Sequence, residues 1–250
     1  MGELVSVDGF PLSGPARGGQ WKILQLEGWW DCPPVKDQPE KRKFGDGSDR
    51  VPILYDERLI TISGRFIARS HEALHAALNQ VTSLAYRGGA EMVVEGHGPV
   101  QSARVDPRNP GIVANIRSDR YVSFVMPLVA TDPYKYGEAR AFDVAMGGTG
   151  EAFHRGTVEA WPNMIVTGDM PSYTIRFRGV DVEVPIGILP GQLHRIEYRT
   201  RRLYVDGSFV MGGFGSTNFR PVQAGIRSDL QLIAQSGSGQ VKMTVNDTYI

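Results

Sequence analysis

Residues 58–89 constrain the fold most, because the hydrophobic period of the chain changes once within them. In the first part, Ile60, Ile62, Gly64 and Phe66 alternate with the residues between them. A period of two is typical of a β-strand that buries one face. The alternation therefore predicts a half-buried strand that begins near Arg58.

A helical period follows this strand. The apolar residues that recur at helical spacing are Leu74, Ala77, Leu78, Val81 and Leu84. They form one stripe, which is typical of a helix lying on a core. Ser70 is a suitable N-cap, Glu72 lies near the positive end of the helix dipole, and Gly88 and Gly89 provide a stop. We expect one helix over residues 70–86, and no other convincing helix in the chain.

The rest of the chain consists of short apolar runs separated by turn residues, with 30 glycines and 16 prolines among 250 residues. This pattern is typical of many strands joined by turns. Residues 135–155 are glycine-rich and lack a clear period, so we expect a boundary there between domains at 1–136 and 137–250. In the second domain, Asp206 and Gly207 separate two apolar runs and predict a hairpin. The fold class is mainly β, with one helix and a second domain that is a β-sandwich.

Composition excludes several classes of function. The formal net charge is zero, so the chain has no overall field to attract nucleic acid. Cys32 is the single cysteine and cannot form an internal disulfide, which favours folding in a reducing cytoplasm. The first ten residues contain no signal-peptide pattern, and no apolar run reaches the roughly 18 residues of a membrane span. We expect a soluble protein made inside a cell.

One enzyme motif is present. His71, Glu72 and His75 form an HExxH sequence on the predicted helix. In zinc peptidases this spacing places two imidazoles on one face, with the glutamate as general base. The candidates for a third ligand are Glu91, Glu95 and His97.

Three features favour a structural interpretation of this motif. His71 directly follows the cap, in the least rigid turn of the helix, whereas metal ligands need firm support. Arg69 brings a cation close to the supposed metal. The candidate third ligands lie on a predicted strand and not on a second helix. We therefore expect both histidines to edge the apolar stripe, with no metal, no cofactor and no catalytic residue.

Two other stretches are candidates for contacts with partners. Residues 31–49 hold three prolines, the charge run Lys41, Arg42 and Lys43, and almost no apolar residues. Such a segment cannot bury itself, so it is either a mobile loop or an arm that becomes ordered against a partner; we favour the arm. Near the end of the chain, the arginines beside Tyr198 and Tyr204 could contact a sugar or a partner, or could belong to a solvated hairpin. No G-x-S-x-G elbow and no phosphate-binding glycine loop occurs.

Taken in order, several segments resemble the distal tail (Dit) family of long, non-contractile-tailed phages, the siphoviruses. The segments that carry the resemblance are SVDGFPL, WKILQLEGWWDCPP, RLITISGRFIARSHEALHAALNQVTSLAYRGG, MPLVATDPYKYG and LPGQLHRIEYRTRRLYVDGSFV. Together they cover nearly the whole chain. Their ordered succession, and no single motif, supports the resemblance.

The resemblance implies a structural, non-enzymatic minor tail protein of the baseplate or tail tip. It implies a β-sandwich-like ring (belt) domain over residues 1–136 with a hairpin arm, and a galectin-like, carbohydrate-binding-module-like sandwich over residues 137–250. Six copies would form a ring hub that joins the tail tube protein to the tail-associated lysin and other tip proteins. The protein would be made in the host cytoplasm and located in the virion, with no nucleic-acid contact required and no membrane insertion.

Within this interpretation, the candidate contacts between copies are Trp29, Trp30, Lys41, Arg42 and Lys43. Deleting residues 37–47 should then leave each domain folded but weaken assembly. The alternative is a carbohydrate-binding module for host-surface adhesion, with Tyr198, Arg202 and Tyr204 as candidate contacts to a glycan. The histidine, asparagine, arginine and tryptophan constellation of galectins has no match here, because the available residues lack its spacing. A zinc peptidase based on HExxH is the third possibility.

Overall fold

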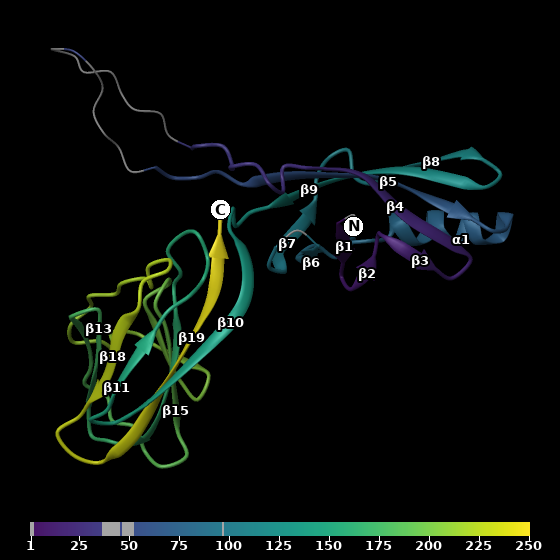
Figure 1. Ribbon diagram of the computed structural model, residues 1–250. Helices are drawn as coiled ribbons and strands as arrows, with labels where there is room; N and C mark the ends of the chain where they lie inside the picture. Colours follow the sequence, from purple (N-terminus) through teal and green to yellow (C-terminus); the bar gives the residue numbers. More distant parts are fainter. Residues whose placement is uncertain (1–2, 37–45, 47–52, 97) are drawn as a thin grey trace. The chain divides into compact units, whose positions relative to one another are not determined.

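The computed structural model describes residues 3–36, 46, 53–96 and 98–250 (Figure 1). The chain divides into two compact units. Unit 1 comprises Met1–Lys135 together with Ile250, and unit 2 comprises Tyr136–Tyr249. Both units consist mainly of strands, so the predicted fold class, mainly β with one helix, is confirmed for the described residues. None of the helices within those residues is long and apolar enough to cross a membrane.

Unit 1 contains nine strands and the helix within its described residues. They are β1 (Leu4–Val7), β2 (Phe10–Pro11), β3 (Gly14–Ala16), β4 (Gly19–Glu27), β5 (Arg58–Ala68), α1 (His71–Thr82), β6 (Ala90–Glu95), β7 (Gln101–Pro107), β8 (Val113–Ser118) and β9 (Tyr121–Ala130). The strands lie in the order β7-β9-β5-β4-β3, with β8 beside β9. β7 also pairs with β6, and β6 in turn pairs with β1.

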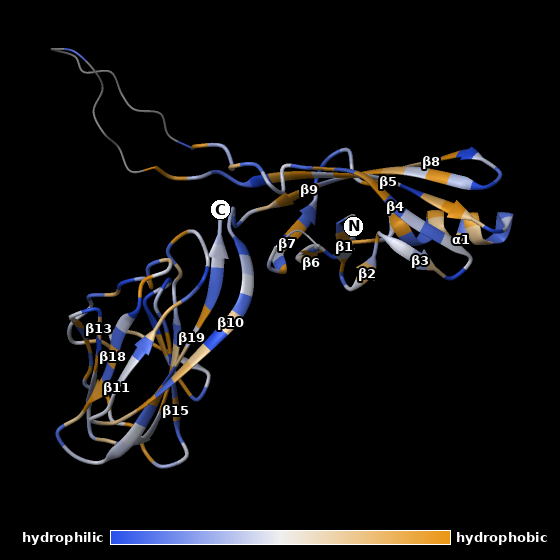
Figure 2. Ribbon diagram, in the orientation of Figure 1, coloured by the Kyte–Doolittle hydropathy of each residue, from blue (hydrophilic) through white to orange (hydrophobic). Residues whose placement is uncertain are grey.

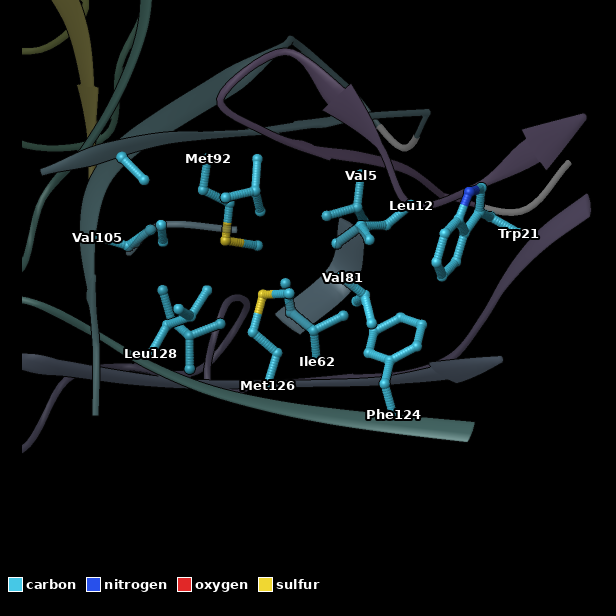
Figure 3. Packing of buried hydrophobic residues seen from close by; sticks show 14 of the residues in the cluster. Val5, Leu12, Trp21, Ile62, Val81, Met92, Val105, Phe124, Met126 and Leu128 are labelled. Carbon is cyan, nitrogen blue, oxygen red and sulfur yellow. The ribbon is translucent and has the colours of Figure 1, made fainter. Parts of the chain in front are cut away.

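β5 has the alternation that the sequence predicts. Ile60, Ile62, Gly64 and Phe66 are buried, whereas the residues between them are partly or fully exposed. The buried side chains lie beside those of the neighbouring strand β9 and face those of β6 and β7 across one core, as Figure 3 shows for Ile62, Met126 and Met92. The period of two therefore assigned the inward face of this strand correctly.

The helix begins as predicted and ends earlier. The Ser70 hydroxyl accepts a hydrogen bond from the Ala73 N–H at 3.2 Å, which is the expected N-cap. Figure 2 shows apolar and polar segments on α1, and the helix buries Leu74, Ala77 and Val81 against the core. However, α1 ends at Thr82 with Ser83 as its C-cap, and the chain continues through turns to Gly88 and Gly89. Gly88 and Gly89 therefore lie at the end of the connection between α1 and β6, and they do not terminate the helix.

Unit 2 is a sandwich of two sheets. Its strands are β10 (Lys135–Ala145), β11 (Thr149–Ala152), β12 (Asn163–Asp169), β13 (Tyr173–Phe177), β14 (Val180–Val184), β15 (Leu193–Glu197), β16 (Arg202–Val205), β17 (Ser208–Val210), β18 (Ser228–Ile233) and β19 (Ser238–Tyr249). One sheet has the order β17-β16-β15-β12-β19-β10, and the other has the order β11-β18-β13-β14. Side chains from both sheets share one buried cluster, as in a β-sandwich.

Two sequence expectations for this unit have different outcomes. The hairpin at Asp206 and Gly207 is confirmed: Val205 pairs with Ser208, and both turn residues have positive φ, 47° for Asp206 and 85° for Gly207. By contrast, residues 135–155 are not irregular, because they contain β10 and β11. Few residues of β10 are fully buried, so its apolar residues do not follow a clear period.

Candidate assembly site at the base of the arm

The described start of the predicted arm pairs with residues that follow the arm in the sequence, and the two segments form a short two-stranded ribbon, which we call the arm base (Asp31–Lys36 and Ile53–Glu57). Val35 and Tyr55 form an antiparallel bridge. The Lys36 N–H donates to the Leu54 carbonyl at 2.8 Å, and the Asp56 N–H donates to the Pro34 carbonyl at 2.8 Å. The ribbon therefore has a defined register where it leaves the body of unit 1.

The arm base exposes apolar side chains. Val35, Ile53 and Leu54 are 48%, 67% and 53% exposed, respectively. Single exposed apolar residues are common on protein surfaces, but three on one short ribbon form a concentrated apolar feature. Such a surface is suited to contact with another protein.

A buried arginine holds the chain at the start of the arm base. Arg58, the first residue of β5, is 1% exposed. Its Nη1 donates to the carbonyl oxygens of Gly28, Trp29 and Asp31 at 2.9, 3.1 and 2.6 Å, and its Nε donates to the Pro133 carbonyl at 3.0 Å. Arg58 therefore ties the segment before the arm base to the segment at the end of unit 1.

Lys135 adds a second buried cation to this arrangement, which we call the Arg58–Lys135 clamp. The Lys135 ammonium donates to the Trp29 carbonyl at 2.9 Å. It also lies 5.7 and 5.4 Å from the ring centroids of Trp29 and Trp30, within cation–π range. The Trp29 carbonyl thus accepts from both cations of the clamp.

Burial lowers the pKa of both clamp residues. It lowers the pKa of the Arg58 guanidinium, an effect that Cys32 and Asp31 partly oppose. For Lys135, burial first and the positive charge of Arg58 second lower the pKa to about 8, against the opposing effect of Asp31. Backbone carbonyls, and not a buried carboxylate, accept the hydrogen bonds from the two cations.

The structure changes the list of candidate contacts between copies. Trp29 is fully buried, so its side chain belongs to the interior of unit 1 and the prediction of a contact role is wrong for it. Trp30 is 45% exposed, and its Nε1 donates to the Glu3 carboxylate at 2.7 Å. Lys41, Arg42 and Lys43 lie outside the described residues.

A second exposed feature lies on unit 2, where cross-strand neighbours on β15, β16 and β17 form a row. Arg195 pairs with Tyr204, which pairs with Phe209. The Arg195 guanidinium lies 4.2 Å from the centroid of the Tyr204 ring, and the Tyr204 and Phe209 centroids are 5.8 Å apart. The guanidinium of Arg202 lies 5.7 Å from the Phe209 ring centroid. We call these four residues the arginine–aromatic row.

Of the predicted glycan contacts, Arg202 and Tyr204 belong to this row, but Tyr198 does not. Tyr198 is fully buried, and its ring contacts Phe177 and Phe219 edge to face. It shares the inward parity of Ile196 as the chain leaves β15, so its side chain enters the core. The prediction of a surface role for Tyr198 is therefore wrong.

The HExxH residues lie on the surface of unit 1. His71, Glu72 and His75 are all exposed, and α1 packs against β5, β8 and β9. The proposed third ligands Glu91 and Glu95 are exposed on β6, and His97 is outside the described residues. In the part of the chain that the structure describes, no group of three or more His, Cys, Asp or Glu residues could hold a metal ion.

Sequence reasoning missed Arg58, Lys135, Arg195 and Phe209. Arg58 has the same parity as Ile60 and Ile62, so the alternation already indicated an inward arginine. The two-residue turn at Asp206 and Gly207 fixes the register that places Phe209 opposite Tyr204. No pattern in the sequence indicated that the side chain of Lys135 is buried.

Comparison with solved structures identifies the fold. No protein-family model and no curated protein matches the chain. The crystal structure of the Dit protein (gp 19.1) of phage SPP1, described as a paradigm of the hub adsorption apparatus in phages that infect Gram-positive bacteria, matches with a TM-score of 0.76 and 11% identity over 100% of both chains. Chains of the phage P2 baseplate in its activated conformation match with TM-scores of 0.52 (with calcium) and 0.50 (with strontium), each at 9% identity over 98% of both chains.

These likenesses extend through both units of the chain. At this level of identity they show shared architecture, which is the architecture that the resemblance to distal tail proteins implied. The chain has a Dit-like fold.

Proposed function

We propose that this protein is a structural component of a phage tail tip, in which copies of the chain assemble into a ring-shaped hub. The observation that carries the proposal is the full-length match to the SPP1 Dit protein. Copies in such a ring meet through two different surfaces, so that the rotation from one copy to the next closes the ring. We further propose a ring of six copies, located in the virion between the tail tube protein and the tail-associated lysin or other tip proteins. We assign it no catalytic role.

The arm base is the surface that we assign to contacts between copies. Its three exposed apolar residues would leave water on assembly, and the Arg58–Lys135 clamp holds the ribbon at a fixed point of unit 1. A fixed ribbon loses less conformational entropy on binding than a free one. Exposed Trp30 lies next to this ribbon in the chain and adds an aromatic side chain of the kind enriched at interfaces.

The test compares two substitutions of equal exposure. Leu54 on the arm base and Ile226 in unit 2 are both 53% exposed. Leu54→Asp should lower the fraction of assembled protein in sedimentation velocity, whereas Ile226→Asp should leave it unchanged. Both variants should keep the wild-type circular dichroism spectrum, because neither side chain belongs to a core. Equal assembly by Leu54→Asp and the wild type would contradict a role for the arm base.

A second candidate function is glycan binding by unit 2 during adhesion to the host surface. The arginine–aromatic row favours it, because exposed aromatic rings beside guanidinium groups provide both apolar and hydrogen-bonding contacts. Phe209 is 52% exposed and Tyr204 is partly exposed. In a glycan array with the full chain, Phe209→Ala and Tyr204→Ala should remove any signal that the wild type gives. No wild-type signal, or a signal that both variants retain, would count against this candidate.

A further inference from the structure

The side chains of His71 and His75 meet at a single point on the exposed surface of α1. The Nε2 atom of His75 lies 3.1 Å from the Nε2 atom of His71. The ring centroids are 4.6 Å apart, and the ring planes form an angle of 76°. Both residues are exposed, whereas the helix buries Leu74, Ala77 and Val81. The core of unit 1 therefore does not hold these imidazoles together; a hydrogen bond between the two Nε2 atoms does, and a metal ion would take the place of its proton.

This separation suits a shared metal ion. Zinc–nitrogen bonds are about 2.0–2.1 Å long, so two nitrogens bound to one tetrahedral ion lie roughly 3.3 Å apart. The two Nε2 atoms are 3.1 Å apart, so they would need to separate only slightly to bind one ion. Imidazole nitrogen is a preferred ligand of zinc, copper and nickel. We propose that His71 and His75 form a two-histidine site for a divalent transition metal of this class.

The surroundings define the kind of site. Glu72 is the next residue along the helix, and successive residues project about 100° apart around the axis. It therefore does not share the face of the two histidines. No third protein ligand joins the pair within the described chain, so the remaining coordination positions of a bound ion would be left to water. A catalytic zinc site uses three protein ligands. As proposed, the HExxH sequence supplies two protein ligands among the described residues, one fewer than a catalytic zinc site uses.

Binding would stabilise the start of the helix. The two ligands are four residues apart, so one ion links successive turns, and Ser70 already caps the first of them. In an unfolded chain the two imidazoles have no fixed separation. A ligand that binds the folded state in preference to the unfolded state raises stability with its concentration. Zinc should therefore raise the thermal midpoint of unit 1.

The test uses the full chain, purified without a histidine tag and freed of metal with a chelator. Titration with zinc chloride, and separately with nickel chloride, should show one saturable site per chain by calorimetry. Loss of an outer-shell partner alone weakens metal sites by about 10–100-fold, so His71→Gln and His75→Gln should each weaken binding at least about tenfold. Neither variant should show the rise in midpoint that zinc produces in the wild type.

Two controls separate this geometry from a general affinity of histidine for metal. Glu72→Gln should retain wild-type affinity, because the carboxylate is not a ligand. The double variant His75→Gln/Ala76→His keeps the number of histidines but moves one of them around the helix, and it should lose the site. Wild-type protein without saturable binding would overturn the proposal, and so would wild-type affinity in the double variant.

Discussion

The two units hold their buried charges in different ways. In unit 1, Arg58 and Lys135 are cations whose hydrogen bonds go to backbone carbonyls. In unit 2, the buried carboxylate of Asp247 accepts two hydrogen bonds from Arg140, at 2.9 and 3.0 Å, and a third from the Arg155 N–H at 2.6 Å. Unit 2 therefore pairs opposite charges, whereas unit 1 uses charge to fix the backbone.

The two arrangements stabilise different kinds of backbone: irregular segments in unit 1 and paired strands in unit 2. The carbonyls that Arg58 and Lys135 bind belong to residues 28–31, where the arm base begins, and to Pro133 near the end of unit 1. Irregular segments have few ladder hydrogen bonds, so side-chain donors must satisfy their carbonyls. In unit 2 the charge pair lies on β10 and β19, which the sheet already holds. Removing the Arg58–Lys135 clamp should therefore lower the free energy of unfolding more than removing the Arg140–Asp247 pair.

The largest effect should come from the clamp arginine. Arg58→Met leaves several carbonyls without their charged donor, and we expect a loss of about 3–5 kcal/mol in the free energy of unfolding. Urea denaturation followed by tryptophan fluorescence measures this loss. Arg58→Lys, which keeps the charge but not the fork of donors, should lose less. A loss below about 1 kcal/mol in Arg58→Met would show that the clamp does not stabilise unit 1.

Lys135 should make the stability of unit 1 rise at alkaline pH. Its pKa is about 8 in the folded protein against 10.5 ordinarily, so between these values the unfolded chain binds more protons. Stability rises with pH wherever the unfolded state binds more protons. Relative to Lys135→Met, the wild type should therefore gain up to about 3 kcal/mol between pH 8 and 10.5. A difference that stays constant over this window would contradict burial of the ammonium.

The charge pair of unit 2 should give a smaller loss. Burial raises the pKa of Asp247, but the hydrogen bonds from Arg140 and the Arg155 N–H lower it by more, so the net shift is downward. Asp247→Asn weakens these charge-assisted hydrogen bonds, and we expect a loss of about 2 kcal/mol at neutral pH. Denaturant unfolding of unit 2 measures it. A loss larger than that of Arg58→Met would reverse the comparison between the units.

The smallest effect should appear at mildly acidic pH. His194 is fully buried, and the hydroxyl of Tyr173 lies 3.0 Å from its Nδ1. Burial lowers the pKa of this imidazole below its ordinary 6.5, with Asp206 partly opposing the shift. As pH falls below about 6.5, the unfolded chain gains a proton that the folded chain does not. Relative to His194→Leu, the wild type should lose stability as the pH falls from 6.5 to 5.5, and a pH-independent difference would contradict this account.

The sequence predicted the features that depend on local periodicity. The alternation of β5, the N-cap at Ser70 and the turn at Asp206 and Gly207 follow from neighbouring residues alone. β10 was missed because few of its side chains are buried, so packing did not impose a period of two on its sequence. Helix length was overestimated because Leu84 continues the apolar stripe from a turn beyond Thr82.

The candidate sites were harder to predict than the elements. Aromatic residues in the sequence suggested surface contacts, but Trp29 and Tyr198 are buried, because long-range packing decides which large side chains face the core. The clamp joins residues 29, 58 and 135, and their meeting depends on how the strands of unit 1 pair. Parity within β5 could have identified Arg58, but no local pattern identified Lys135.

The central claim is that this Dit-like chain assembles into a ring. The most direct test is the mass of the full-length protein in solution, measured by multi-angle light scattering with negative-stain images of the same peak. The account predicts a mass near six times the 27.5 kDa of one chain and ring-shaped particles. A mass of one chain across the whole concentration range, with no rings in the images, would contradict it.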